Sequence, residues 1–357
     1  MKKRLQSVVI FGETGFTLVE VMVAMVIGMI GIIVMMQVFS AAEGQKRSTT
    51  GSGDAQSSGA MALYALQRDI RQSGYGFNAL NALGCPLALG APSSHTLSQL
   101  APVMINPPVA DVPAGDANTD TLLVAYGSSE GSPEGDAITA LNGTQLGVQT
   151  PVNFANGHRV IAAPSSPTNG CALSLATVSA VAAPNVTVAS SGAVEGGSLF
   201  NLGAAPKILA YAVRNGNLTV CDYMATDCGA ACTATDNTCS ASWVPIVNNI
   251  ASLRVQYGHA STAVSGVDSW DQTTPPLSTP SQATLACLWA RTSAARIAVL
   301  VRNSQVDKDV LTGIAPVWEG SADAPFDLTA RANWQNYRYK VFETVIPVRN
   351  LPWMASC

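Results

Sequence analysis

The chain has few charged, aromatic and histidine residues, and these shortages narrow the classes of protein it can be. Charged side chains make up 12% of the 357 residues and aromatic side chains 6%, a composition typical of exported β-rich proteins. The net charge is −4 and no basic patch is visible, which argues against a nucleic-acid-binding surface. The histidines are scattered, without the spacing of a metal site or a catalytic triad; they are His95, His158 and His259.

A second long apolar run is also missing, so only residues 16–39 could cross a membrane. These 24 residues would form a helix of about 36 Å, enough for a bilayer core of about 30 Å. Lys2, Lys3 and Arg4 precede the run, and the positive-inside bias places this end in the cytoplasm. Everything beyond about residue 40 is then expected on the other side, in the periplasm or outside the cell.

The order of the N-terminal features is unlike that of a secretory signal, in which the apolar region precedes the cleavage site. Here a short basic leader and a Gly15-Phe16 junction come first, so a cut between them would keep the apolar helix. Glu20 lies just inside that helix, where a lone charge costs up to about 3 kcal/mol. An ammonium group about 4 Å away would return about 4 kcal/mol at an effective dielectric constant of 20. The carboxylate is therefore tolerable in lipid and is stabilised once paired.

The string Gly-Phe-Thr-Leu-Val-Glu from Gly15 to Glu20 resembles the processing site of type IV prepilins and their secretion-system relatives. The resemblance implies that a prepilin peptidase cleaves after Gly15 and methylates the new amine of Phe16, giving N-methylphenylalanine. It also implies that Glu20 meets the N-terminal amine during assembly. The residues before Gly15 are Glu13 and Thr14 rather than basic, a departure from the family pattern. The alternative is an ordinary single-pass anchor whose Glu20 reaches the membrane interface.

The remaining sequence predicts an α+β fold: a long N-terminal transmembrane and amphipathic helix packed on a β-rich, antiparallel, pilin-like globular domain. Helix is expected to be weak over residues 48–59, which are rich in glycine and in residues that favour turns. From Ala60 onward, Leu63, Leu66 and Ile70 share one helical face. Strands are predicted at 121–126, 178–189, 208–213, 218–223, 244–257, 296–302 and 339–348. The predicted divisions are a leader (1–15), a membrane helix (16–39), its amphipathic continuation (40–75) and a periplasmic domain (76–357).

The number of cysteines is even, as expected for disulfides in an oxidising compartment. Four of them follow a C-x6-C-x3-C-x6-C pattern, which lacks the close pairs and histidines usual in zinc sites. We expect the four clustered cysteines to pair among themselves and predict no metal site. The disulfide candidates are Cys85, Cys171, Cys221, Cys228, Cys232, Cys239, Cys287 and Cys357.

Four later segments sharpen the resemblance from prepilins in general to the PilW family of minor pilins. They are residues 68–75 (RDIRQSGY), 255–258 (VQYG), 299–302 (VLVR) and 342–350 (FETVIPVRN). The resemblance implies a minor pilin in a tip or priming complex that initiates pilus assembly. Its expected partners are the prepilin peptidase, the inner membrane, and other minor and major pilins. The expected location is the inner membrane, then the pilus tip. A pseudopilin of a type II secretion system and a membrane-tethered binding module or adhesin are the alternatives.

Two further kinds of motif in the sequence could indicate catalysis or metal binding. Residues 127–131 read G-x-S-x-G around Ser129, but Pro133 and Gly135 follow where a nucleophile elbow needs a helix. No catalytic set is therefore predicted and the chain is not expected to be an enzyme. Two acidic clusters are candidates for binding calcium, although the first lacks the glycine and glutamate of a calcium loop. These clusters are Asp116, Asn118 and Asp120, and Asp222, Asp227 and Asp236.

Overall fold

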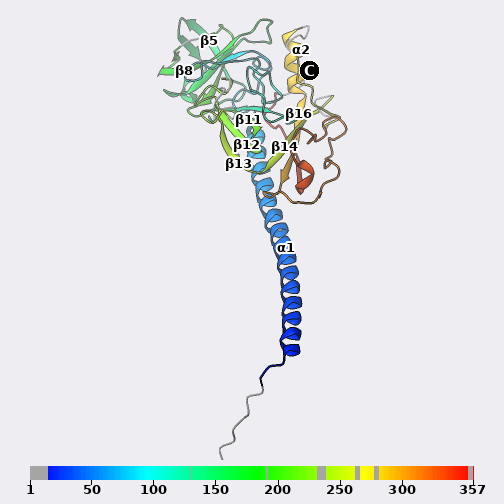
Figure 1. The fold of residues 1–357 in the computed structure, drawn as a ribbon. Helices are drawn as coiled ribbons and strands as arrows, with labels where there is room; N and C mark the ends of the chain where they lie inside the picture. Colours follow the sequence, from blue (N-terminus) through cyan, green and yellow to red (C-terminus); the bar gives the residue numbers. More distant parts are fainter. Residues whose placement is uncertain are drawn as a thin grey trace, which may run out of the picture. The chain divides into compact units, whose positions relative to one another are not determined.

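The computed structural model describes residues 15–129, 131–189, 192–230, 239–261, 266–276, 281–352 and 357. The chain divides into two compact units, residues 1–52 and 53–357. A single helix, α1 (Leu18–Gln72), contributes its first part to one unit and its last turns to the other (Figure 1).

In the first unit, the apolar part of α1 is exposed along its length. Its most apolar window has a mean hydropathy of 2.7 and none of it is buried. Phe16, Ile27 and Phe39 are 82%, 64% and 76% exposed. Among the described residues, α1 is the one helix long and apolar enough to cross a membrane. This confirms the predicted apolar helix.

The prediction of weak helix over residues 48–59 is wrong: α1 continues unbroken through them to Gln72. One of its glycines serves close packing in the globular unit: a Cβ on Gly59 would lie 2.2 Å from the ring of Phe342. Ala62, Leu66 and Ile70 are fully buried on the same part of the helix, and Leu63 packs against this core. The predicted apolar face is therefore the face that enters the core.

The described residues of the globular unit form three sheets, and the largest has the order β2-β1-β8-β7-β10-β5-β6-β9. All of its pairings are antiparallel except β1–β8. Because β9 pairs with β8 as well as with β6, six strands close into a ring around an apolar core of their own. The strands are β1 (Leu87–Ala88), β2 (Thr96–Leu97), β5 (Asp136–Asn142), β6 (Gln145–Val148), β7 (Arg159–Ala163), β8 (Leu173–Ala182), β9 (Asn185–Val188) and β10 (Ser198–Gly203).

The other two sheets share the main core with the last turns of α1. A five-stranded sheet has the order β13-β12-β11-β4-β3, and a four-stranded sheet has the order β15-β14-β16-β17. Their strands are β3 (Val103–Ile105), β4 (Leu122–Tyr126), β11 (Lys207–Arg214), β12 (Asn217–Asp222), β13 (Val244–Val247), β14 (Ile250–His259), β15 (Ser269–Asp271), β16 (Thr292–Arg302) and β17 (Tyr339–Pro347). The fold class is α+β, as predicted.

Two predicted strands are each divided in the structure. The 178–189 run turns at Pro184 and forms the β8–β9 hairpin. The 244–257 run splits at Asn249, whose φ is +64°, so that β13 and β14 belong to different sheets. The short helices α2 (Gln282–Ala290), η1 (Pro151–Asn153) and η2 (Trp334–Asn336) were not predicted.

Three disulfides are present among the described cysteines: Cys85–Cys171, Cys221–Cys228 and Cys287–Cys357. Cys239 is also disulfide-bonded, and none of the described cysteines is free. Cys232 lies outside the described residues. The structure thus pairs two of the clustered cysteines with each other and ties the last residue of the chain to α2.

Candidate assembly site

The residues that sequence analysis singled out for processing stand at the start of α1. Gly15 and Phe16 precede the helix, and Thr17 caps it: the backbone N–H of Glu20 donates to Thr17 Oγ1 at 3.3 Å. Thr17 and Glu20 have the three-residue spacing of a capping box, in which such a hydrogen bond satisfies an otherwise unpaired N–H. The sequence therefore starts the helix immediately after the predicted cleavage point.

The position of Glu20 in the first turn also suits its charge. A helix N-terminus carries a partial positive charge, which favours a carboxylate there by about 0.3–1 kcal/mol at an exposed site. The Glu20 side chain is exposed, and within the described ranges no Lys, Arg or His forms an ion pair with it. Its carboxylate is therefore open to a cation from outside the helix.

The last turns of α1 carry a buried carboxylate, Asp69, whose role was not predicted from the sequence. Asp69 is fully buried and accepts hydrogen bonds from the hydroxyls of Tyr126 on β4, at 3.0 Å, and Tyr211 on β11. Arg68 covers it with two N–H groups at 2.8 and 3.1 Å. This arrangement fastens the end of α1 to the five-stranded sheet.

Burial raises the pKa of the two tyrosines, and the contact with Asp69 raises the pKa of each of its three hydrogen-bond donors. Burial, followed by the charge of Asp69, raises the pKa of both Tyr126 and Tyr211 above the ordinary tyrosine value. The hydrogen bond and the charge of Asp69 raise the pKa of Arg68. Both tyrosines are therefore neutral hydrogen-bond donors at physiological pH.

The C-terminal segment also contacts the last turns of α1. The Asn350 side chain donates to the carbonyl oxygens of Gln72 and Ser73, at 3.2 and 3.1 Å, and so satisfies the last carbonyls of the helix. Gly74 follows with a φ of +79°, a conformation that glycine adopts without strain. Phe342 on β17 packs on Gly59. Residues 68–75 and 342–350, two of the segments that carried the resemblance, therefore meet in space.

The other candidates from the sequence have structural partners. Ser129 Oγ accepts the Gly131 N–H at 3.0 Å, and within the described part of the chain no helix follows β4 before β5. The G-x-S-x-G segment is therefore a loop and not a nucleophile elbow, and Glu130 lies outside the described residues. The three histidines lie apart, beside different partners: His95 with Asp111, His158 with Asn201, and His259 with Asp271.

The first proposed calcium segment is also occupied by protein contacts. Asp116 accepts two backbone N–H groups and pairs with Arg331, and Asp120 pairs with Arg254 at 3.0 Å. Asn118 donates to Asp327. In the second cluster Asp222 pairs with Lys207, and Asp236 lies outside the described residues. No group of three acidic, cysteine or histidine side chains suited to a metal ion occurs where the structure is described, so calcium stays an untested prediction.

Two family models match the chain in the regions described above. Residues 211–350 match the model described as type IV pilus-assembly protein W. Residues 11–36 match the prokaryotic N-terminal methylation motif. No curated protein and no solved structure matches the chain.

Proposed function

We propose that the chain is a type IV pilus minor pilin of the PilW family and that it joins a tip or priming complex that starts pilus assembly. One observation carries the proposal: a single helix begins with the methylation motif and ends fastened inside the PilW-matched part of the fold, through Tyr211, Phe342 and Asn350. The family is structural rather than catalytic, and we assign the chain no reaction of its own.

The proposed route begins with cleavage between Gly15 and Phe16 by the prepilin peptidase, followed by methylation of the Phe16 amine. The cap formed by Thr17 supports this assignment, because the helix begins just beyond the scissile bond and would remain intact. Removing the leader takes away Lys2, Lys3, Arg4 and Glu13, which changes the net charge from −4 to −4 − 3 + 1 = −6.

In the assembled fibre, Glu20 is the residue that positions the helix against its neighbour. In our proposal its carboxylate pairs with the Phe16 amine of a neighbouring pilin, because no cation of the described chain pairs with it. At about 4 Å and an effective dielectric constant near 20, this pair offsets the cost of placing the carboxylate in lipid. Assembly is favoured over the free membrane state for this reason.

The proposed topology places the leader in the cytoplasm, residues 16–39 in the inner membrane and the rest in the periplasm. The apolar helix and the pilin motif support anchoring in a membrane, and the disulfides fit an oxidising compartment. The boundary at residues 52 and 53, where the globular unit begins, falls within the proposed continuation helix of 40–75.

The Glu20→Ala variant tests the proposed function. We expect the variant to insert and to be processed normally, while its content in sheared pili falls at least tenfold. Glu43→Ala is the matched control, since Glu43 is an exposed glutamate of the same helix that pairs with Arg47 at 3.5 Å. Normal incorporation of Glu20→Ala would count against the role of this carboxylate.

A further inference from the structure

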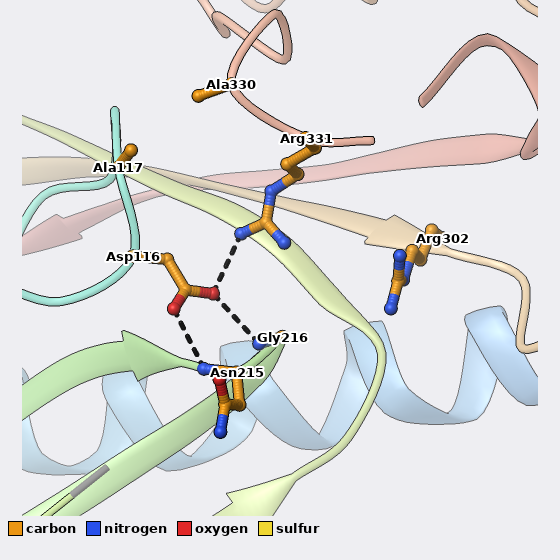
Figure 2. Close-up of a pocket in the computed structure, with 7 residues that line it drawn as sticks. All are labelled: Asp116, Ala117, Asn215, Gly216, Arg302, Ala330 and Arg331. Atoms are coloured by element: carbon orange, nitrogen blue, oxygen red, sulfur yellow. Dashed lines mark hydrogen bonds and ion pairs between the residues drawn. The ribbon is translucent and has the colours of Figure 1, made fainter. Parts of the chain in front are cut away.

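A pocket of about 490 Å³ opens on the globular unit. Its wall includes the tight turn of the β11–β12 hairpin at Asn215 and Gly216, the segment at Asp116, and the arginines Arg302 and Arg331 (Figure 2). The turn residues have φ values of +49° and +70°, which brings backbone N–H groups to the pocket wall. All but the Asp116 segment belong to the PilW-matched region.

Asp116, the acidic residue among the described residues that line the pocket, already binds neighbouring groups of the protein. Its Oδ1 accepts the Asn215 N–H at 2.8 Å, and its Oδ2 accepts the Gly216 N–H at 2.9 Å. Arg331 Nη2 donates to the same Oδ2 at 3.0 Å. Figure 2 shows the Arg331 guanidinium between Asp116 and Arg302. The contact with the Asp116 carboxylate holds Arg331 in place.

The second arginine, Arg302, is held in place without a carboxylate. It ends β16, and its guanidinium lies over the Tyr337 ring at 4.6 Å from the ring centre. Its Nε is buried and has no hydrogen-bond partner, and no ion pair involves it within the described ranges. Two guanidinium groups and one carboxylate leave the pocket with one net positive charge.

We infer that this pocket binds a carboxylate presented by a partner pilin subunit, with Arg302 as the main donor. A guanidinium offers parallel N–H groups that match the two oxygens of a carboxylate. A singly charged anion neutralises the site, and the stacking on Tyr337 lowers the cost of ordering the Arg302 side chain. The identity of the partner as a pilin rests on the proposed function, whereas the chemistry of the ligand does not.

The same charges argue against a nucleic-acid backbone as the occupant. Such a surface needs several basic groups along a strand, whereas this pocket has two arginines and Asp116 beside them. The chain as a whole carries a net charge of −4, which repels a polyanion. A short peptide segment with one acidic group has the required charge without that repulsion.

The ligand chemistry is tested on the full chain in detergent micelles, labelled with ¹⁵N-arginine and titrated with sodium acetate. We expect acetate to shift the Arg302 Nε–H resonance, identified by its absence in Arg302→Gln, well beyond the shift caused by equal sodium chloride. Arg302→Lys keeps the charge but loses the planar fork, and we expect it to bind acetate at least fivefold more weakly. Shifts equal to those of chloride, or matched by a single-stranded oligonucleotide at the same charge concentration, would overturn the inference.

The partner is tested in cells by measuring the content of the chain in sheared pili. We expect Arg302→Gln to lower it at least fivefold, whereas Lys308→Gln, which removes one exposed cation from a nearby loop, leaves it unchanged. As a control for normal processing, we expect Phe16 to be methylated in both variants. Wild-type pilus content for Arg302→Gln would overturn the inference. If the unaltered chain never enters pili, the proposed function fails instead, while acetate binding still tests the pocket.

Discussion

Single residues fix where α1 begins and where it is held. Glu20 and Asp69 are both acidic residues of this helix, but one is exposed in the first turn and the other is fully buried. Buried polar groups destabilise a fold unless their hydrogen bonds are made, and Asp69 gains its own from Arg68, Tyr126 and Tyr211. Asp69 is therefore a structural anchor, whereas Glu20 remains available for a partner.

Replacing Asp69 with alanine should lower the free energy of unfolding of the globular unit by about 3–5 kcal/mol. The cause is that the buried hydroxyl of Tyr211, the half-buried hydroxyl of Tyr126 and Arg68 would lose their shared acceptor. Asp54→Ala, at an exposed site on the same helix, should change it by less than about 0.5 kcal/mol. Urea unfolding of the full chain in detergent measures the free energy of unfolding of both variants. Equal losses for the two variants would show that Asp69 does not anchor the helix.

The two acidic residues also differ in how far the sequence predicts their roles. Glu20 stands out because it interrupts an apolar run and follows a recognisable junction. Asp69 is part of the RDIRQSGY string, but its tyrosine partners lie 57 and 142 residues along the chain. Only the folded structure brings those hydroxyls to the helix, so its role could not be predicted from local spacing.

Among the secondary-structure elements, α1 shows that glycine residues do not always interrupt a helix. Gly53 and Gly59 both lower intrinsic helix propensity, yet their surroundings differ. Nothing lies within 4 Å of a Cβ built on Gly53, whereas one on Gly59 would meet the Phe342 ring at 2.2 Å. The helix persists through both because its buried face packs in the core of the globular unit, which overrides propensity.

Alanine substitutions at these two glycines should therefore have opposite effects. Gly53→Ala should stabilise the chain by about 0.5–1 kcal/mol, because alanine loses less backbone entropy in a helix. Gly59→Ala should destabilise it by about 1–3 kcal/mol, because Phe342 must move out of its contact. Thermal unfolding followed by circular dichroism compares the stability of the two variants. If both substitutions stabilised the chain, the close packing of Phe342 on Gly59 would be contradicted.

The strands were predictable where local signals were strong. The apolar runs at 208–213 and 218–223 predicted two strands, and the structure confirms them as β11 and β12, joined by a tight turn at Asn215 and Gly216. The division of residues 244–257 between two sheets depends on a positive φ at Asn249, which apolar patterning does not reveal. The six-strand ring closes through the β8–β9 hairpin, a topology that no single segment encodes.

At the scale of the whole molecule, disulfides connect segments of the globular unit that are far apart in sequence. Cys85–Cys171 spans 86 residues and Cys287–Cys357 spans 70, whereas Cys221–Cys228 spans 7. A longer closed loop removes more conformational entropy from the unfolded chain. The even cysteine count predicted disulfides, but the pairing depended on the fold.

Removing the disulfides in matched pairs should reveal this order. In the chain-entropy model, Cys85→Ala with Cys171→Ala costs about 4.5 kcal/mol, and Cys221→Ala with Cys228→Ala costs about 2.5 kcal/mol. Urea unfolding of each double variant under oxidising conditions provides the comparison. An equal or reversed order would show that native packing around the sulfurs, rather than loop length, dominates their contribution.

The central claim is that the chain is trimmed at the Gly15–Phe16 bond so that the helix capped by Thr17 can enter a fibre. N-terminal sequencing and mass spectrometry of the protein purified from its native membranes and from sheared pili test this most directly. We predict a chain that begins at N-methylated Phe16 in both fractions. A mature protein that still begins at Met1, and that is absent from pili, would contradict the account.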